Sequence, residues 1–265
     1  MLPFFFKHYD PIVRKYVVFD DGSTDDSLAM LKKHPKVELR PMPVPVDTDS
    51  RIVSQLAVLE ESWQESKGDA DWVIVTDIDE LIWHPNLAAY LRDMLEQGVT
   101  VIPALGFDMI AEDMPQARDC LTDVVVFGAP THLYSKINIF SPNAIQSMRF
   151  TLGRHHAKPL GRVQIPADDK LFLLHYKYLG FDRLVKRNVQ YLTRQRSKDL
   201  QYEWGAQYSW DEQRLRQEWQ TVKLRAINVK MANSQDWEKA GGKKWWPEQL
   251  KTHDSRTASQ AAQQS

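Results

Sequence analysis

The feature that most constrains the fold is a pair of short apolar segments that each end in carboxylates. Residues 16–19 read Tyr-Val-Val-Phe and lead directly into the aspartates at 20–21. Residues 72–76 read Trp-Val-Ile-Val-Thr and lead into the Asp-Ile-Asp at 77–79. Short runs rich in β-branched and aromatic residues that stop at turn-forming residues are typical of buried strands. The sequence therefore predicts two strands with acidic residues at their carboxyl ends.

Between these strands the sequence alternates with helical patterns. Apolar residues at 52, 56, 59 and 63 lie on one helical face. The expected order is strand 16–19, helix 23–33, strand 37–39, helix 49–67, strand 72–76, helix 86–97 and strand 99–107. Alternation of this kind is typical of a parallel sheet covered by helices. Such sheets place their sites at the carboxyl ends of the strands, so we expect both acidic clusters to open into one cleft.

The pattern changes in the second half. Residues 123–178 read as irregular strands and loops, and residues 181–232 as mainly helical. The mixed charges of 183–196 suggest a solvated helix face, or less directly a contact with anionic lipid. Six tryptophans in the last third are expected to pack helices together rather than stack on sugars. Residues 251–265 are polar and low in complexity, and we expect them to be disordered.

Composition excludes several classes of protein. The net charge is −1, without the basic surplus of a nucleic-acid binder. Cys120 is the only cysteine, so an intramolecular disulfide and a cysteine-based metal site are both excluded. No apolar run is long enough to span a bilayer, and any membrane contact should be peripheral. These features favour a cytoplasmic protein.

The acidic residues suggest two kinds of binding. Asp77 and Asp79 offer carboxylates on either side of one residue, a set that suits Mg²⁺ or Mn²⁺. Such an ion can neutralise the charge of a leaving diphosphate. Asp20 and Asp21 could accept hydrogen bonds from a nucleobase or a ribose. The alternatives are a solvated acidic loop and a strand–turn–helix junction around Gly22, which would not account for two aspartates.

The segments Val18-Phe-Asp-Asp-Gly-Ser-Thr-Asp25 and Val75-Thr-Asp-Ile-Asp-Glu80 resemble the family 2 glycosyltransferases and their close GT-A relatives, over about residues 3–110. The resemblance implies a GT-A fold, an α/β architecture with a mainly parallel central sheet flanked by helices and a helical C-terminal extension. The implied regions are a catalytic domain at 1–178, a helical region at 179–250 and the tail. Family members usually carry a strand before a helix like Leu2–Tyr9, so the first strand is expected to be missing.

The resemblance also implies an activity. It is metal-dependent transfer of a sugar from a nucleotide-sugar donor, most simply a UDP-sugar, to a glycan, lipid-linked or protein acceptor. Asp20 or Asp21 would hold the nucleoside, Asp79 the metal, and Asp77 the metal or the ribose. In several GT-A enzymes a histidine late in the catalytic core is the third metal ligand, and the Leu173-Leu-His-Tyr-Lys177 context of His175 is similar. A core histidine is the alternative.

The remaining candidates concern catalysis. His155 and His156, in Gly153-Arg-His-His156, could meet the donor phosphates or the acceptor. An inverting transferase needs a base near the acceptor hydroxyl. Asp169 lies at a distance along the sequence from Asp79 similar to that of the base in family 2 enzymes. Other acids are also available as this base, at positions 108, 112, 113 and 168.

Two other functions fit parts of the sequence. A phosphatase of the haloacid dehalogenase type also has Asp-x-Asp after an apolar strand and uses the first aspartate, here Asp77, as a nucleophile. Its motif normally has threonine or valine where this chain has Leu81, and it gives no role to the Asp-Asp-Gly-Ser segment. A degenerate GT-A domain that binds sugars or serves as a scaffold is the non-catalytic alternative.

Overall fold

The computed structural model of the protein describes residues 1–43 and 49–246. Its architecture is organised by one long strand, β5 (Val101–Ala111), whose first seven residues are all buried. An uninterrupted apolar strand of this kind needs cover on both faces. β7 (Lys136–Phe140) pairs antiparallel with the first part of β5 and β6 (Phe127–Pro130) with the later part. β10 (Phe172–Leu179) pairs with β5 in parallel.

The sheet is mixed, so the α/β prediction is confirmed but the mainly parallel arrangement is wrong. Its order is β11–β6–β5–β10–β4, and β3 is joined through β7. β3 (Val73–Ile74), β4 (Glu80–Trp83) and β11 (Ile227–Asn228) all pair antiparallel with their neighbours. In this seven-stranded sheet, within the described ranges, only β5 and β10 run parallel. The apolar pattern marked several strands, but the strand expected at 72–76 is only Val73–Ile74 and β4 was not expected; the pattern also does not specify which strand lies beside which.

Two smaller sheets and the helices complete the fold. β1 (Tyr16–Asp20) and β2 (Val37–Pro41) form a parallel pair, and β8 (Ile145–Ser147) and β9 (Leu160–Gly161) an antiparallel one. The helices are α1 (Leu2–Tyr9), α2 (Ser27–Lys33), α3 (Arg51–Glu61), η1 (Ser62–Ser66), α4 (Leu87–Glu96), α5 (Leu121–Val124), η2 (Leu152–Arg154), α6 (Phe181–Thr193), α7 (Ser197–Gln201), η3 (Ala206–Ser209), α8 (Glu212–Arg225) and α9 (Ser234–Lys239).

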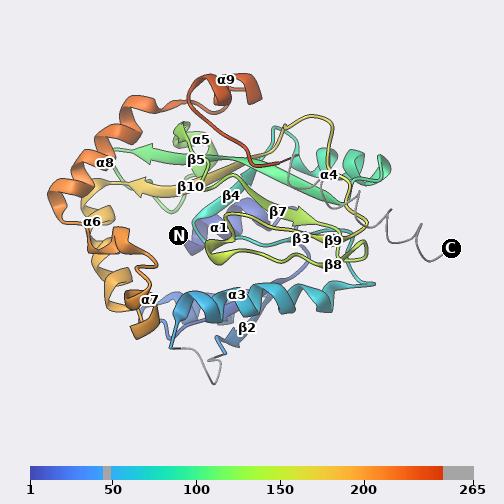
Figure 1. Cartoon of the computed structure of the whole chain (residues 1–265), viewed down its shortest axis with the longest axis horizontal. Helices are drawn as coiled ribbons and strands as arrows, with labels where there is room; N and C mark the ends of the chain where they lie inside the picture. Colours follow the sequence, from blue (N-terminus) through green and yellow to red (C-terminus); the bar gives the residue numbers. More distant parts are fainter. Residues whose placement is uncertain (44–48, 247–265) are drawn as a thin grey trace.

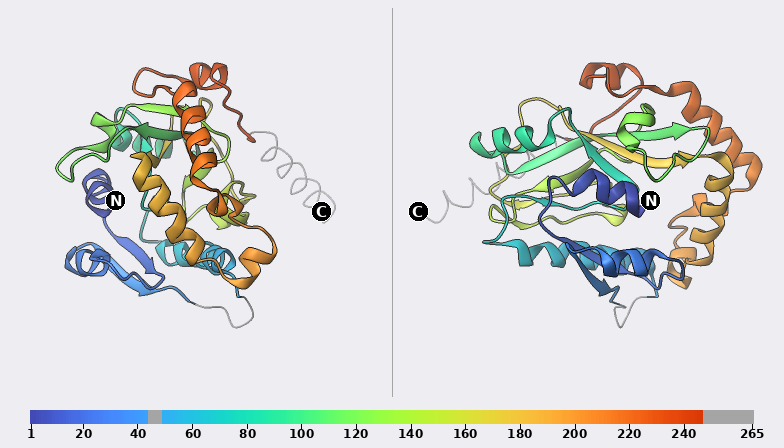
Figure 2. Two further views of the ribbon diagram at one scale, coloured as in Figure 1. Left: turned by 90° about the vertical axis from the view of Figure 1, so that its left-hand side faces the viewer. Right: turned by 180° about the vertical axis from the view of Figure 1, so that it is seen from behind.

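The arrangement places the later helices at one end of the sheet. Figure 1 shows α6, α7 and α8 along its left-hand end, with α3 below the strands, and Figure 2 shows the same grouping from the side and from behind. The helical character expected after residue 180 is therefore confirmed, while the tail at 251–265 lies outside the described residues. Within the described part, no helix combines the length and the apolar character needed to cross a membrane.

Tryptophans anchor the last described segment on the sheet. Trp237 is fully buried, and its indole N–H donates to the carbonyl oxygen of Gly106 in β5 at 2.8 Å. The indole of Trp245 donates to the carbonyl oxygen of Ser135 at 2.9 Å. A Cβ at Gly106 would lie 2.3 Å from the backbone carbonyl carbon of Tyr134, so only glycine fits there. These two tryptophans therefore pack on the sheet, and not between helices as was expected.

Candidate functional site

A cleft of about 950 Å³ gathers most of the predicted site residues. It lies between the turn after β1, the N-terminal half of α3, the turn between β3 and β4, and the inward face of α6. Six predicted residues line it: Asp20, Asp21, Asp77, Asp79, His155 and His175. The expectation that both acidic clusters open into one cleft is confirmed, although the sheet around it is mixed.

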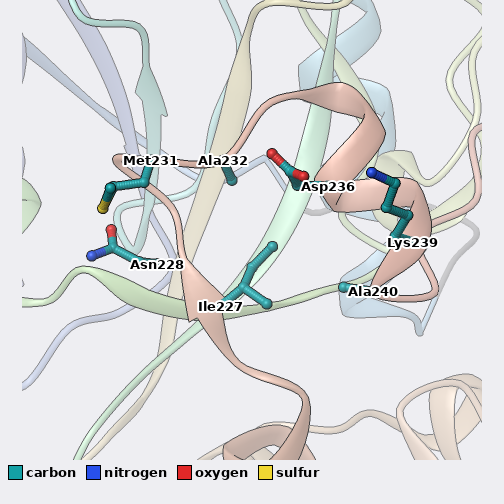
Figure 3. A pocket seen from close by; sticks show the side chains of 7 residues that line it. All are labelled: Ile227, Asn228, Met231, Ala232, Asp236, Lys239 and Ala240. Carbon is teal, nitrogen blue, oxygen red and sulfur yellow. The ribbon is translucent and has the colours of Figure 1, made fainter.

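A second hollow, of about 490 Å³, lies between β11 and α9 (Figure 3). Its charged lining residues are Asp236 and Lys239, and the others are Ile227, Asn228, Met231, Ala232 and Ala240. None of the predicted site residues lines it. A single acid and a single base without a histidine offer little chemistry, so the candidate site is the larger cleft.

The first acidic pair is already engaged by neighbouring groups. The carboxylate of Asp20 accepts backbone N–H groups from Gly22 at 3.1 Å and Ser23 at 3.2 Å. Asp20 therefore shapes the turn after β1, as the junction interpretation expected. The carboxylate of Asp21 forms ion pairs with Arg51 at 3.1 Å and Arg196 at 3.4 Å. Asp21 thus joins the turn to α3 and to the start of α7.

Asp77 is the more accessible member of the second pair, with 42% of its side chain exposed. Its Oδ1 accepts from Nε2 of Gln55 at 3.2 Å, and its Oδ2 from the guanidinium of Arg154 at 3.1 Å. Arg154 has a positive φ of 58° and is 2% exposed. The arginine inside the Gly-Arg-His-His segment is therefore the residue that reaches Asp77.

Beneath the Asp-x-Asp turn lies a buried charge network that the sequence analysis missed. Glu80 is fully buried and contacts Lys136 at 2.6 Å and Arg154 at 2.8 Å. Burial alone would raise the pKa of Glu80, but the two cations outweigh it and hold that pKa well below its usual value. The only sequence signal was a third acidic residue directly after Asp79. This network fixes the turn that presents Asp77 and Asp79.

Asp79 and His175 form the centre of the site. Asp79 is 9% exposed, and its Oδ2 accepts from the guanidinium of Arg187 and lies 3.5 Å from Nε2 of His175. His175, 3% exposed, contacts Oδ1 of Asp108 through Nδ1 at 2.8 Å. Its ring stacks on Tyr134 with centroids 3.7 Å apart. In β10, His175 stands opposite Asp108 of β5 on one side and opposite β4 on the other.

These contacts shift both pKa values. Burial favours the neutral form of Asp79, but Arg187 and then His175 outweigh it and hold the pKa of Asp79 well below its usual value. Burial likewise favours neutral His175, but hydrogen bonds to Asp108 and Asp79 outweigh it and raise the pKa of His175. The centre is therefore a buried carboxylate held between the guanidinium of Arg187 and the imidazole of His175.

Two of these residues have the spacing expected of ligands to one divalent cation. Metal–ligand distances near 2.1 Å place two ligands of one ion roughly 3–3.5 Å apart, and Asp79 Oδ2 and His175 Nε2 are 3.5 Å apart. The contact with Asp108 orients the imidazole, as is usual for metal-binding histidines. Within residues 1–43 and 49–246 there is no group of three or more His, Cys, Asp or Glu side chains arranged to hold a metal. One or two protein ligands suffice for Mg²⁺ when phosphates complete its coordination.

Other predicted catalytic residues are placed differently. His155 lines the cleft, with Nδ1 at 2.6 Å from the carbonyl oxygen of Leu133. His156 does not line it, and its ring packs against Trp245 with centroids 5.1 Å apart. Asp169 does not line it either, because its carboxylate accepts from Lys244 at 2.7 Å and from the indole of Trp246 at 2.8 Å. The structure therefore leaves His156 and Asp169 away from the gathered carboxylates.

α6 and its C-cap contribute cations, where the sequence analysis expected a solvated helix face. Arg183, Lys186, Arg187 and Arg194 all line the cleft. The first three follow the spacing i, i+3 and i+4, which places them on one side of the helix. Among the described residues, Arg187 has a carboxylate partner, while no ion pair joins the other three to an acid. That spacing was the available signal, and it places three cations on one wall of the cleft.

The site thus combines carboxylates, an imidazole beside one of them and the cations of α6, of which Arg187 is paired with Asp79. Comparison with known protein families gives no matching family model, and no curated protein matches the chain by sequence.

Proposed function

We propose that the protein is a glycosyltransferase that moves a sugar from a nucleotide-sugar donor to a glycan, lipid-linked or protein acceptor. The observation that carries the proposal is the meeting of Asp77, Asp79 and His175 with the cations of α6 in one cleft. A donor of this class has the matching chemistry, because its diphosphate is anionic, its ribose carries hydroxyl groups and its phosphates bind divalent cations. A UDP-sugar is the donor that the family resemblance suggests.

The residues then take distinct roles. Arg183 and Lys186 lie where they would neutralise the donor diphosphate, and Asp77, with 42% of its side chain exposed, is available to the ribose or a metal. Asp79 and His175 would hold Mn²⁺ or Mg²⁺, which supplies positive charge to the leaving diphosphate. Asp108 orients His175. His155 lies in the cleft and is the candidate to meet the phosphates or the acceptor hydroxyl.

A non-catalytic nucleotide-sugar-binding module is the second candidate. It is favoured by one observation: Asp20, Asp21, Asp77 and Asp79 each already accept from a cation, an amide or a backbone N–H. A carboxylate engaged in this way is poorly disposed to remove a proton. The phosphatase alternative would use Asp77 as nucleophile, and the ion pair of this carboxylate with Arg154 lowers its reactivity in the same way.

The test is calorimetric titration of UDP and of UDP-sugars with and without Mn²⁺. We expect Mn²⁺ to strengthen binding, and Asp79→Asn to weaken Mn²⁺-dependent binding at least about tenfold by removing a ligand charge. Asp123→Asn, which removes a carboxylate paired with Lys230 outside the cleft, should leave binding unchanged. Thermal unfolding controls for loss of fold, because Asp79 is buried beside Arg187 and His175.

Activity separates the candidates. Hydrolysis or transfer of the donor sugar would support an enzyme, and donor binding without turnover would support the binding module. Turnover of simple phosphomonoesters would favour the phosphatase. If the wild-type protein binds no nucleoside diphosphate, with or without Mn²⁺, the proposal fails.

A further inference from the structure

Arg187 contacts the carboxylate oxygen that a metal ion between Asp79 and His175 would also need. Its guanidinium contacts Oδ2 of Asp79, the same oxygen that lies 3.5 Å from Nε2 of His175. A cation–π contact also holds the side chain, because its guanidinium lies 5.0 Å from the ring centroid of Tyr191. It is 17% exposed, on the wall of the cleft. The cation seen at Asp79 is thus an arginine supplied by the protein.

A guanidinium and a divalent ion that contact the same oxygen repel each other, because both are cations. Charges of the same sign repel strongly at short range inside a protein, and the double charge of a divalent ion increases this repulsion. Binding of an ion between Asp79 and His175 therefore requires the guanidinium of Arg187 to leave Asp79. Arg187 acts as a competitor for the metal position.

The displaced guanidinium remains in a cationic part of the cleft. Arg183 and Lys186 line the same side, and neither forms an ion pair with an acid among the described residues. Burial lowers the pKa of Arg183, and the neighbouring charge of Arg187 lowers it further. Movement of the Arg187 guanidinium toward Arg183 and Lys186 is favourable only when an anion offsets the repulsion between the three cations. A diphosphate has the required charge, and its oxygens match the donors of a guanidinium.

We propose that Arg187 is a diphosphate-binding residue that is held on Asp79 until a metal ion displaces it. The inference rests on the proposed function, because it assigns Arg187 to the phosphates of the donor. Metal binding releases the guanidinium, and nucleotide binding keeps it away from Asp79. Either ligand favours breaking of the contact between Arg187 and Asp79, and the other ligand then binds without breaking it. This gives positive coupling between metal and nucleotide.

Removing Arg187 should have opposite effects on the two ligands. In calorimetry with Mn²⁺ alone, Arg187→Ala should bind Mn²⁺ about fivefold or more tightly than wild type, because the competitor is gone. In calorimetry with UDP at saturating Mn²⁺, where the guanidinium is released, the same variant should bind less tightly than wild type. The increase in UDP affinity caused by Mn²⁺ should also be smaller than in wild type.

Two further variants distinguish specific displacement of Arg187 from a general effect of removing positive charge. Arg194→Ala removes another cation of the same cleft, one without an ion pair to any described residue, so it should weaken UDP binding and leave Mn²⁺ affinity unchanged. Arg187→Lys keeps a cation at Asp79 without the planar fork, so its Mn²⁺ affinity should lie between wild type and Arg187→Ala. This variant also keeps the inference testable if Arg187→Ala folds poorly.

The outcomes distinguish the inference from the proposed function. If wild type binds Mn²⁺ and UDP, but Arg187→Ala or Arg187→Lys binds Mn²⁺ no more tightly than wild type, the displacement is overturned and the proposed function stands. Equal tightening in Arg194→Ala would also overturn it, because general charge would then be the cause. If wild type binds neither ligand, the proposed function fails and the inference fails with it.

Discussion

Replacing Glu80 with glutamine should be the most damaging small change at the site. Glu80 is fully buried and contacts Lys136 at 2.6 Å and Arg154 at 2.8 Å. Both cations are themselves 2% exposed. Glutamine keeps the size of the side chain but removes its charge. Lys136 is then buried without a carboxylate, while Arg154 keeps its contact with Asp77.

The magnitude follows from the burial. Removing one partner of a buried ion pair costs about 3–5 kcal/mol, because the other charge is left uncompensated. Because Arg154 retains a partner, we expect the lower part of that range, about 3 kcal/mol. The free energy of unfolding of a domain is about 5–15 kcal/mol in total. At an m-value of about 3 kcal/mol per molar in urea, the unfolding midpoint should fall by roughly 1 M.

Urea unfolding followed by circular dichroism measures this shift at constant ionic strength. The matched control is Glu65→Gln, which also removes a carboxylate with two short contacts, both to Arg40, but whose side chain is 56% exposed. An exposed pair contributes at most about 1 kcal/mol. If Glu80→Gln and Glu65→Gln lose equal stability, the reasoning about buried charge is refuted.

The pH dependence gives a second check on the same variant. The pKa of Glu80 is lowered in the folded protein, so the ionised carboxylate contributes stability above the ordinary carboxyl pKa, near about 4.3. That contribution is lost as the pH falls toward the lowered pKa. The stability difference between wild type and Glu80→Gln should therefore be constant near neutral pH and shrink below about pH 4. A difference that grows in acid would contradict this sign.

Three further predictions concern the sheet and the site. Trp237→Phe should lower the free energy of unfolding by about 1–3 kcal/mol, since it removes the hydrogen bond to Gly106 and leaves a cavity; an unchanged thermal midpoint would contradict this. Gly106→Ala should cost about 3 kcal/mol in urea unfolding, because its Cβ would lie 2.3 Å from the carbonyl carbon of Tyr134. Asp108→Asn should weaken Mn²⁺ binding roughly 10–100-fold in calorimetry by releasing the His175 ring, and full affinity would rule out the orienting role.

The sequence predicts the elements of this fold better than their partners. The segments at 16–19, 37–39 and 99–107 are strands, because their residues favour buried extended backbone whatever lies beside them. The parallel sheet was inferred from alternation alone. It is mixed because residues 80–83 form a strand antiparallel to β10, and because β6 and β7 turn back on β5. Pairing depends on contacts between distant residues, which local patterns do not encode.

The site shows the same division. Carboxylates after apolar strands were predictable, since strand ends and turn residues are local signals. The side chains that contact these carboxylates and His175 were not predictable. Arg187 reaches Asp79 from a helix more than a hundred residues later, and Asp108 reaches His175 from a neighbouring strand. Arg187 lies in a helix of mixed charge and Asp108 in an apolar strand, and neither pattern indicates which side chain it contacts, so only the three-dimensional arrangement reveals these partners.

The position of β10 has a consequence for how the protein is made. β10 lies between β5 and β4, so the strand that comes last of the three along the chain is inserted between two earlier ones. A nascent chain that ends before Phe172 holds Asp79 and Asp108 but lacks the histidine that lies between them. Pairing across such long separations is slow to form. Ligand binding at this cleft would therefore report completion of the sheet, and a ligand supplied during refolding would favour the chains in which β10 has been inserted.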